Sequence, residues 1–306
     1  MKGRIYKSTG NWYRIKSEDG NFINARLKGK FKIDDITSSN PIAVGDYVEY
    51  SANDGAENIV ITEILKRENY INRISPANRN QHHIIASNLD QSLLFASFRE
   101  PKTSLGFIDR FLVTAEAYHV PAIIVFNKVD LYKEKELAKL ELAEELYSEI
   151  GYRVLRMSIK SGEGLAEVSE LLKNKTTLLT GHSGVGKSSF INYILPDINL
   201  KTKEVSNWSG KGLHTTTFAE MYDLPAGGSI IDTPGIRELG LADIAVGEVS
   251  HYYPEMRELI HFCRFNNCIH TDELDCAVKD AVASGKIHEE RYINYLKILE
   301  SMNKQW

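Results

Sequence analysis

Cysteine is scarce in this chain of 306 residues, which contains three: Cys263, Cys268 and Cys276. An odd number confined to one short stretch does not supply the network of disulfides that holds small secreted domains together. The lack of cysteine elsewhere therefore excludes a disulfide scaffold. The close spacing of the three favours a metal site instead.

Long apolar runs are also missing. The longest, such as residues 121–126, fall far below the roughly 20 residues that a helix needs to span a bilayer. The first residues, MKGRIYK, carry positive charge, but no apolar stretch follows them as it does in a secretory signal. We therefore expect a cytoplasmic protein that does not contact a membrane.

An overall excess of basic charge is absent as well. The formal net charge is −4, so any contact with nucleic acid has to come from a local patch. Hydrophobic residues make up 42% of the chain and charged residues 25%, which is ordinary globular composition. At roughly 150 residues per domain, the length predicts two or three domains.

The N-terminal part reads as short strand segments separated by turn residues. The five segments are residues 4–6, 12–16, 21–27, 46–50 and 58–65. Five strands in so short a stretch predict a small barrel of the OB type. The first 33 residues hold nine Lys or Arg against two acidic residues, interleaved with the rings of Tyr6, Trp12, Tyr13 and Phe22. This pattern suits a nucleic-acid surface, but a solvated basic face over core aromatics explains it equally well.

Between residues 88 and 233, apolar strand segments alternate with helical ones. Strands are expected at 91–96, 122–126, 152–157, 176–180, 218–222 and 229–231, and helices at 108–118, 133–150, 165–172 and 187–195. This alternation predicts a mostly parallel sheet that is covered by helices on both faces, with ligand loops at the carboxyl ends of the strands. After about residue 241 the strands stop, and helical text continues to a well-patterned helix at 289–302.

The segment GHSGVGKS at residues 181–188 fits the phosphate-loop pattern G-x-x-x-x-G-K-[ST] between an expected strand and an expected helix. Its glycines let backbone N–H groups converge on phosphate, and the helix N-terminus adds partial positive charge. Lys187 would reach the outer phosphates, and Ser188 would bind Mg²⁺. The residues expected to contact the nucleotide here are Gly181, Ser183, Gly184, Val185, Gly186, Lys187, Ser188 and Ser189.

A second motif, NKVD, begins at Asn127 and follows the expected strand 122–126. The Asp130 carboxylate can accept hydrogen bonds from N1–H and the 2-amino group of guanine, a pair of donors that adenine lacks. Lys128 would lie along the purine, and Asn127 would tie this loop to the phosphate loop. These features favour GTP over ATP. The residues expected to hold the guanosine are Asn127, Lys128, Asp130, Ser158 and Lys160, the last two from the segment SIK, which resembles the S-A-K element of GTPases.

Two segments match the switches of GTPases. The segment DTPG ends an expected strand, where Asp232 would bind Mg²⁺ through water and the Gly235 N–H would sense the γ-phosphate. In the segment GLHTTT at residues 212–217, a threonine hydroxyl would bind Mg²⁺, and we favour Thr216 over Thr215.

The attacking water has no glutamine to orient it. Ile236 follows Gly235 where Ras-like enzymes carry that glutamine, so we expect slow unaided hydrolysis. His214 is the best local candidate for positioning the water, although an exposed loop histidine explains it equally well. The expected catalytic set is His214, Thr216, Asp232 and Gly235.

The order of these motifs differs from that of ordinary GTPases, in which the phosphate loop comes first. Here the N-K-x-D and S-A-K elements precede it, so the domain looks circularly permuted. A short surface link at residues 173–175 would join the original ends, because exposed loops tolerate new connections.

The three cysteines form the pattern Cys263-x4-Cys268-x-His270-x5-Cys276. Three thiolates and an imidazole make a complete tetrahedral Zn²⁺ set with no open position for water, which predicts a structural site. His261 is the competing imidazole, with a less suitable spacing. The neighbouring helices have few apolar residues of their own, so the metal should hold this unit together.

Together these features resemble the ribosome small-subunit-dependent, circularly permuted GTPases of the RsgA family over the whole chain. The segments that carry the resemblance beyond the motifs are residues 86–91, 108–112, 183–189, 214–217 and 276–279. Two departures are ELD at 273–275, where the family usually has Glu-Pro-Gly, and Ile159 in place of Ala. Neither replaces a ligand side chain.

The resemblance implies a GTPase that binds the small ribosomal subunit and assists its late maturation, with hydrolysis stimulated by the subunit. It also implies that the barrel and the zinc unit hold ribosomal RNA. We expect a monomer with one structural Zn²⁺ and with Mg²⁺ bound alongside GTP. An alternative from another class is a GTP-gated RNA-binding protein in which hydrolysis is incidental or the activator is not the ribosome.

The sequence thus predicts a multidomain protein. We expect an OB-like RNA-binding barrel over residues 1–70, an α/β P-loop GTPase domain with permuted motif order over 71–243, and a mostly helical zinc-binding domain over 244–306.

Overall fold

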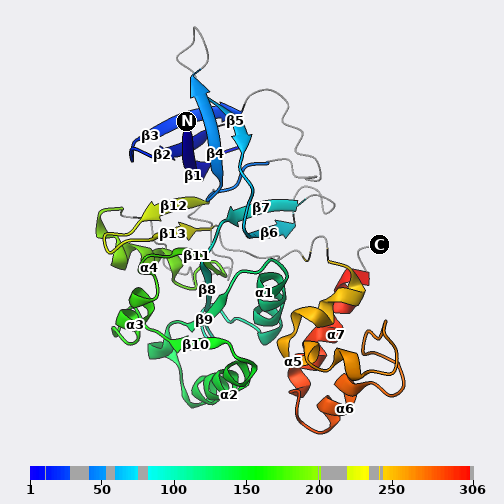
Figure 1. The fold of residues 1–306 in the computed structure, drawn as a ribbon. Coiled ribbons are helices and arrows are strands. Elements are labelled where there is room, and N and C mark those ends of the chain that lie inside the picture. The colour runs from blue at the N-terminus through cyan, green and yellow to red at the C-terminus, as the bar shows by residue number, and fades with distance from the viewer. Residues whose placement is uncertain are drawn as a thin grey trace.

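The computed structural model describes residues 1–10, 12–27, 41–52, 59–74, 82–198, 200, 219–233, 241 and 244–303. Figure 1 shows barrel strands at the top, a sheet with flanking helices below them, and a group of short helices to one side. Within these ranges, no helix is both long enough and apolar enough to cross a membrane.

The first strands form the barrel that the sequence predicts. They are β1 (Lys2–Ser8), β2 (Tyr13–Ser17), β3 (Phe22–Leu27), β4 (Tyr47–Ala52) and β5 (Ile59–Ile64). Their order is β1-β2-β3-β5-β4, and β4 pairs back onto β1 to close the barrel. Alternating side chains such as Ile5, Tyr13 and Ile15 fill the interior, as the period of a strand requires. The prediction of a five-stranded barrel is confirmed.

The central sheet has the permuted α/β topology. Its strands are β8 (Gln91–Ala96), β9 (Ala122–Phe126), β10 (Arg153–Arg156), β11 (Thr176–Gly181), β12 (Glu220–Asp223) and β13 (Ser229–Asp232). The spatial order is β10-β9-β8-β11-β13-β12, and all neighbouring pairs are parallel except β12 with β13. The strand that leads into the phosphate loop, β11, therefore lies between strands that precede it in the chain and strands that follow it.

Helices cover both faces of this sheet and create two apolar cores. They are α1 (Leu105–Ala117), α2 (Glu134–Ile150), α3 (Leu165–Glu170) and α4 (Lys187–Ile194), with short 3-10 turns at η1 (Val129–Leu131) and η2 (Pro196–Ile198). Along β8, Leu94 packs into the core shared with α1 and α2, whereas Leu93 and Phe95 pack into the core shared with α3 and α4. A strand that is buried on both faces has a continuous run of apolar residues, and this run is why the sequence predicts β8.

Two features of the sheet were not predicted. A hairpin of β6 (Tyr70–Ile74) and β7 (His82–Ser87) connects the barrel to the central sheet. In addition, β1 pairs with β12 at Lys7 and Glu220, so barrel and α/β strands form one 11-stranded sheet. The sequence gives no sign of this contact, because it joins strands that lie more than 200 residues apart in the chain.

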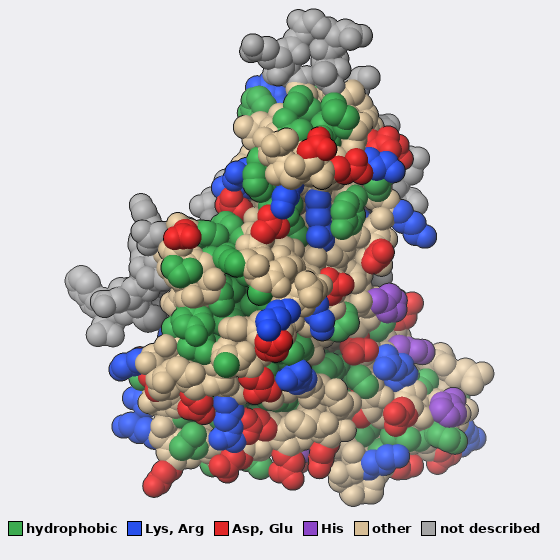
Figure 2. All heavy atoms as spheres, turned by 60° about the vertical axis from the view of Figure 1, so that its left-hand side comes forward, with side chains coloured by type: hydrophobic (Ala, Val, Ile, Leu, Met, Phe, Trp, Pro, Cys, Tyr) green, Lys and Arg blue, Asp and Glu red, His purple; other side chains and the backbone are tan. Residues whose placement is uncertain are grey.

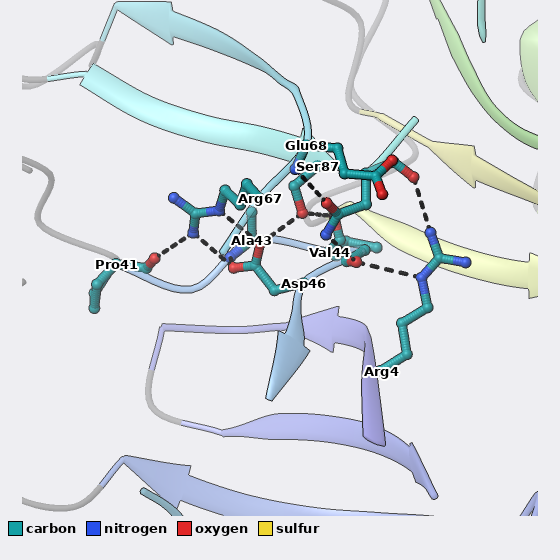
Figure 3. Close-up of polar contacts among 10 residues, drawn as sticks. Arg4, Pro41, Ala43, Val44, Asp46, Arg67, Glu68 and Ser87 are labelled. Carbon is teal, nitrogen blue, oxygen red and sulfur yellow. Dashed lines mark hydrogen bonds and ion pairs between the residues drawn. The ribbon is translucent and has the colours of Figure 1, made fainter. Parts of the chain in front are cut away.

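Polar contacts join the barrel to the connecting hairpin and the residues beside it (Figure 3). The Asp46 carboxylate is fully buried and accepts hydrogen bonds from Arg67, from the Ser87 hydroxyl at 2.6 Å and from the backbone of Ala43. Arg4 of β1 donates to the carbonyls of Gly45 and Asn88 and to the hydroxyl of Thr176 at the start of β11. One guanidinium thus joins the barrel, the connecting hairpin and the central sheet.

The C-terminal part is helical and has a core of its own. Its elements are η3 (Val246–Tyr252), α5 (Pro254–Arg257), η4 (Ile260–Phe262), α6 (Ala277–Ala283) and α7 (Glu289–Asn303). Val249, Tyr253 and Tyr295 are fully buried in this core, and Val113 of α1 packs into it. The C-terminal unit, residues 244–303, is therefore docked on one helix of the central sheet, as Figure 1 also shows.

Candidate nucleotide site and metal centre

The carboxyl ends of four strands bring the predicted nucleotide residues to one edge of the sheet. The phosphate loop follows β11, Asn127 follows β9, Ser158 lies just beyond β10, and Asp232 ends β13. Parallel strands bind ligands at this edge because their loops and helix N-termini converge there. The structure therefore groups residues from segments up to about 100 positions apart in the sequence.

The phosphate loop needs glycine at two of its positions. Gly181 and Gly186 have φ angles of 133° and 111°, in the region that side chains disfavour. A Cβ at Gly181 would lie 2.3 Å from the Phe95 carbonyl oxygen, and one at Gly186 would lie 2.2 Å from Asn127 Nδ2. The loop can adopt this path only without side chains there, which explains the two glycines of the pattern.

Lys187 lies at the first position of α4, beneath the loop. Its Nζ donates to the carbonyls of Gly181 at 2.8 Å and His182 at 3.2 Å, and its side chain is buried. Burial lowers the pKa of Lys187 to about 8, and the nearby Asp232 carboxylate opposes that shift. An anion above the loop would favour the charged form of the ammonium group and raise this pKa again.

The residues expected to hold the base are tied to the phosphate loop and to one another. Asn127 is buried, and its Nδ2 donates to the carbonyl of Val185 at 2.8 Å. The Ser158 hydroxyl donates to Asp130 Oδ1 at 2.6 Å, which orients the exposed Asp130 carboxylate. Lys128 has a left-handed backbone and donates to the carbonyl of Glu100. The sequence predicted that Ser158 helps to hold the guanosine, but it did not predict the hydrogen bond to Asp130.

The two switch segments are only partly described. Asp232 is buried at the end of β13, and the neighbouring Thr233 hydroxyl donates to the carbonyl of Leu179 at 2.9 Å. The remaining residues of the expected catalytic set lie outside the described residues: His214, Thr216 and Gly235, together with the alternative Thr215 and with Ile236. Of the other expected nucleotide contacts, Gly184 and Lys160 are exposed, and Ser183, Ser188 and Ser189 are half-buried.

The sequence did not predict one residue that contacts the phosphate loop. The ring of Phe107, in the first turn of α1, packs against the imidazole of His182 with ring centroids 3.9 Å apart. His182 occupies an unrestricted position of the phosphate-loop pattern, so the pattern itself gives it no role. The contact depends on tertiary structure alone.

A second group of side chains gathers in the C-terminal unit. The ligand atoms of Cys263, Cys268, His270 and Cys276 lie within 4.8 Å of one another. His270 Nδ1 lies 3.3 Å from the sulfurs of Cys268 and Cys276 and 3.6 Å from that of Cys263, and the sulfurs of Cys263 and Cys276 are 3.9 Å apart. His261 is exposed and stacks on Phe262 instead.

These separations fit a tetrahedral ion. Bonds of about 2.3 Å to sulfur and 2.0 Å to nitrogen require S···S edges of about 3.8 Å and N···S edges of about 3.5 Å. Burial raises the pKa of the Cys268 thiol to about 12 and lowers that of His270. Thiolates packed so closely need a cation to compensate them, so the donor set suits a metal that prefers sulfur and nitrogen.

Two of the aromatic residues of the barrel are buried, and two are exposed where they could contact nucleic acid. Tyr6 and Tyr13 are buried, whereas Trp12 and Phe22 are exposed. The guanidinium of Arg26 lies 4.0 Å from the centre of the Trp12 ring system, and that of Arg14 lies 4.1 Å from the centre of the Phe22 ring. Figure 2 shows basic and hydrophobic side chains side by side over the barrel on the face it presents.

The fold and the grouped motifs define a circularly permuted P-loop GTPase. The family model described as RsgA GTPase matches residues 64–242, and the model of the RsgA N-terminal domain matches residues 2–60. The chain belongs to the RsgA GTPase family.

Curated relatives are similar in sequence over almost the whole chain. A Flavobacterium psychrophilum protein named small ribosomal subunit biogenesis GTPase RsgA is 51% identical, covering 98% of this chain and 93% of its own length. A Bacteroides thetaiotaomicron protein named small ribosomal subunit biogenesis GTPase RsgA 2 is 47% identical, covering 98% of this chain and 96% of its own.

Solved structures agree as well. YjeQ from Thermotoga maritima has a TM-score of 0.76 at 36% identity, covering 98% of this chain and 97% of that one. YloQ, described as a circularly permuted GTPase, has a TM-score of 0.73 at 32% identity, covering 100% and 96%.

Proposed function

We propose that this chain is a GTPase that acts in the biogenesis of the small ribosomal subunit, hydrolysing GTP to GDP and phosphate. The observation that carries the proposal is the hydrogen bond from Asn127 Nδ2 to the Val185 carbonyl at 2.8 Å. It ties the loop that carries Asp130 to the loop that would carry the phosphates, so that one nucleotide could contact both. The names of the relatives supply the biological setting.

Each part of GTP has a proposed partner. The backbone of residues 181–189 and the Lys187 ammonium would hold the phosphates, and the Asp130 carboxylate would select guanine. Ser158 would hold that carboxylate in place through its hydroxyl, and Lys160 would flank the base. Mg²⁺, bound by the Ser188 hydroxyl and a switch threonine, would neutralise charge on the β- and γ-phosphates.

Hydrolysis is proposed to depend on the switches. Asp232 would hold Mg²⁺ through water, Gly235 would sense the γ-phosphate, and Thr216 would complete the Mg²⁺ shell. His214 would position the attacking water in place of the glutamine that Ile236 replaces. An enzyme without that glutamine is slow alone, so we infer that a partner accelerates it.

We infer that the partner is the small ribosomal subunit with its RNA. The arginines stacked on Trp12 and Phe22 offer cations for phosphates and rings for bases, which is the arrangement that OB-type surfaces use. The Cys3His group would bind one Zn²⁺ as a structural ion, and the protein would act as a cytoplasmic monomer. The proposed units are the barrel at 1–70, the GTPase domain at 71–243 and the zinc unit at 244–306.

The test is steady-state GTP hydrolysis with and without purified small subunits, at two salt concentrations, with ATP as the control. We expect a low rate with GTP alone, a many-fold increase with small subunits and a weaker increase at high salt, because salt screens phosphate contacts. GTP turnover that small subunits do not stimulate would support the GTPase activity and contradict the proposed role of the ribosome. Unchanged turnover after His214→Ala would show that His214 takes no part in the chemistry.

A further inference from the structure

Helix α1 touches the phosphate loop at its first turn. Phe107 packs on His182 with ring centroids 3.9 Å apart and an angle of 30° between the rings. The backbone N–H of Phe107 donates to the side chain of Ser104, which caps the helix. The start of α1 is thus held in a defined place against a residue of the loop.

Two residues after Phe107, α1 carries the buried carboxylate of Asp109, whose partners all come from other elements. Asp109 Oδ1 accepts from Arg291 at 2.6 Å and from the Tyr147 hydroxyl at 2.7 Å, and Oδ2 accepts from Asn294 at 2.7 Å. Arg291 and Asn294 belong to α7, and Arg291 also donates to Glu255 at 2.7 Å. Asp109 and Arg291 are 0% and 1% exposed, so this ion pair has no solvent to replace a lost partner.

Helix α7 continues this connection to the metal group. The Tyr292 hydroxyl donates to the carbonyl of His270 at 2.6 Å, and the Tyr295 hydroxyl donates to the carbonyl of Ile269 at 2.7 Å. These carbonyls belong to the segment that carries the predicted metal ligands. A continuous series of close contacts therefore runs from that segment through α7 and α1 to the phosphate loop.

The approach of α7 to α1 leaves little freedom. A Cβ at Gly106 would lie 3.3 Å from Asn294 Oδ1, which is tighter than most real contacts. Buried, fully paired polar clusters of this kind fix one arrangement, because any displacement leaves a charge without a partner in a low dielectric. The orientation of α1 is therefore set by the C-terminal unit as well as by the central sheet.

We propose that Asp109 is a positioning residue for nucleotide binding: it locks α1 to the C-terminal unit, and α1 in turn holds the phosphate loop through Phe107 and His182. The inference rests on the proposed function only in that the phosphate loop is the part that holds GTP. The buried link between Asp109 and α7, rather than the stability of the C-terminal unit as a whole, then sets how well the loop is formed before nucleotide arrives.

The chain offers two matched controls. Arg257 forms an ion pair of 3.1 Å with Glu116, which joins the same two parts through side chains that are 52% and 26% exposed. Val278 is fully buried in the core of the C-terminal unit, on α6, and its apolar side chain takes no part in the hydrogen bonds of Asp109. Arg257→Ala removes the exposed ion pair between the two parts. Val278→Ala destabilises the C-terminal unit but leaves the buried ion pair of Asp109 with Arg291 intact.

The first experiment measures hydrogen exchange of the amides at residues 181–187 in the nucleotide-free full chain. For Asp109→Asn we expect exchange about ten-fold faster than in the unmodified chain, and for Arg257→Ala and Val278→Ala no change in this loop. Equal acceleration in Asp109→Asn and Val278→Ala would overturn the proposal, since it would indicate general loosening. An unchanged loop in Asp109→Asn would overturn it too.

The second experiment measures KM and kcat for GTP. We expect Asp109→Asn to raise KM about five-fold with kcat within about two-fold, because it removes pre-organisation of binding rather than a transition-state contact. Phe107→Leu should also raise KM, because it breaks the contact between α1 and His182. The KM of the double variant should be no higher than that of the more impaired single variant, since both substitutions break one series of contacts. Additive losses would contradict the proposal. If the unmodified chain hydrolyses no GTP, the proposed function fails, whereas hydrogen exchange still decides the role of Asp109.

Discussion

Asp130 selects the base in the proposed site through the donors that it can accept from. Asp130→Asn replaces one accepting oxygen with an N–H donor, which suits xanthine because xanthine carries a carbonyl where guanine has its 2-amino group. We expect affinity for GDP to fall roughly 100-fold or more and affinity for XDP to rise above it. Competition of the two against a fluorescent GDP analogue measures this, with the unmodified chain as the control. Equal losses for both nucleotides would show that Asp130 does not read the base.

Lys187 gives nucleotide binding a dependence on pH. Burial lowers its pKa to about 8 in the free protein, and bound phosphates must raise it again because they favour the charged form. The charged form binds, so affinity for GDP should be constant below pH 7 and fall towards about ten-fold per pH unit above pH 8. The fall should be absent in Lys187→Ala, which binds weakly at every pH.

Proton uptake tests the same residue directly. At pH 8, about half of the free Lys187 is neutral, so binding of GDP should take up roughly 0.5 proton. Calorimetry in two buffers of different ionisation enthalpy measures that number. Uptake near zero at pH 8 would mean that the lysine is already charged before the phosphates arrive.

At the scale of an element, the Cys3His segment between η4 and α6 has little regular structure to hold it. The Arg264 and Asp275 backbones are joined by one hydrogen bond, and the Glu273 carboxylate accepts from the N–H groups of Ile269 and Thr271 at 2.7 Å. These contacts shape a short loop, but they do not compensate three thiolates. The metal is therefore expected to contribute a large share of the stability of this unit.

A chelator should loosen the C-terminal unit. Purified chain is expected to hold about one Zn²⁺, and its removal should lower the thermal midpoint and reduce the helical signal in circular dichroism. Cys276→Ser should behave like the chelated protein, while Arg264→Ala, which breaks an exposed ion pair beside the site, should keep its metal. Full retention of helicity after the metal has been stripped would argue against a structural ion.

Arg4 matters at the scale of the whole molecule, because its three hydrogen bonds reach the barrel, the connecting hairpin and β11. Arg4→Met keeps most of the apolar stem and leaves those acceptors unpaired. It should lower the free energy of unfolding by about 1–3 kcal/mol, which urea denaturation would show as a lower midpoint. Lys2→Met on the same strand breaks an exposed ion pair and should cost well under about 1 kcal/mol. Similar shifts in both variants would show that Arg4 adds nothing to the junction.

Local patterns predicted much of this molecule. The strands at 91–96 and 122–126 have the predicted boundaries, and α7 begins at the predicted Glu289, because each depends on its own apolar period. The glycines and lysine of the phosphate-loop pattern can be predicted for a similar reason, since the pattern is contained in eight consecutive residues. The four predicted metal ligands were also brought together in space.

Contacts between distant segments could not be predicted in the same way. The pairing of Lys7 with Glu220, and the burial of Arg291 against Asp109, join residues about 200 positions apart. An arginine on a helix reads as a solvated residue until a partner in another part of the chain is known. The hairpin β6–β7 was missed because its polar and apolar residues follow no clean alternation.

The pairing of β1 with β12 also protects the molecule from self-association. A sheet that ends in an open strand offers unpaired N–H and C=O groups to any passing chain, and proteins cover such edges. Here the barrel supplies the cover, since β12 is the outermost α/β strand and β1 lies beside it. A shortened chain that lacks the barrel would present β12 as a free edge and would lose Tyr6 from the core of the α/β part, so it should oligomerise or aggregate. The barrel thus covers an edge of the central sheet that would otherwise be open.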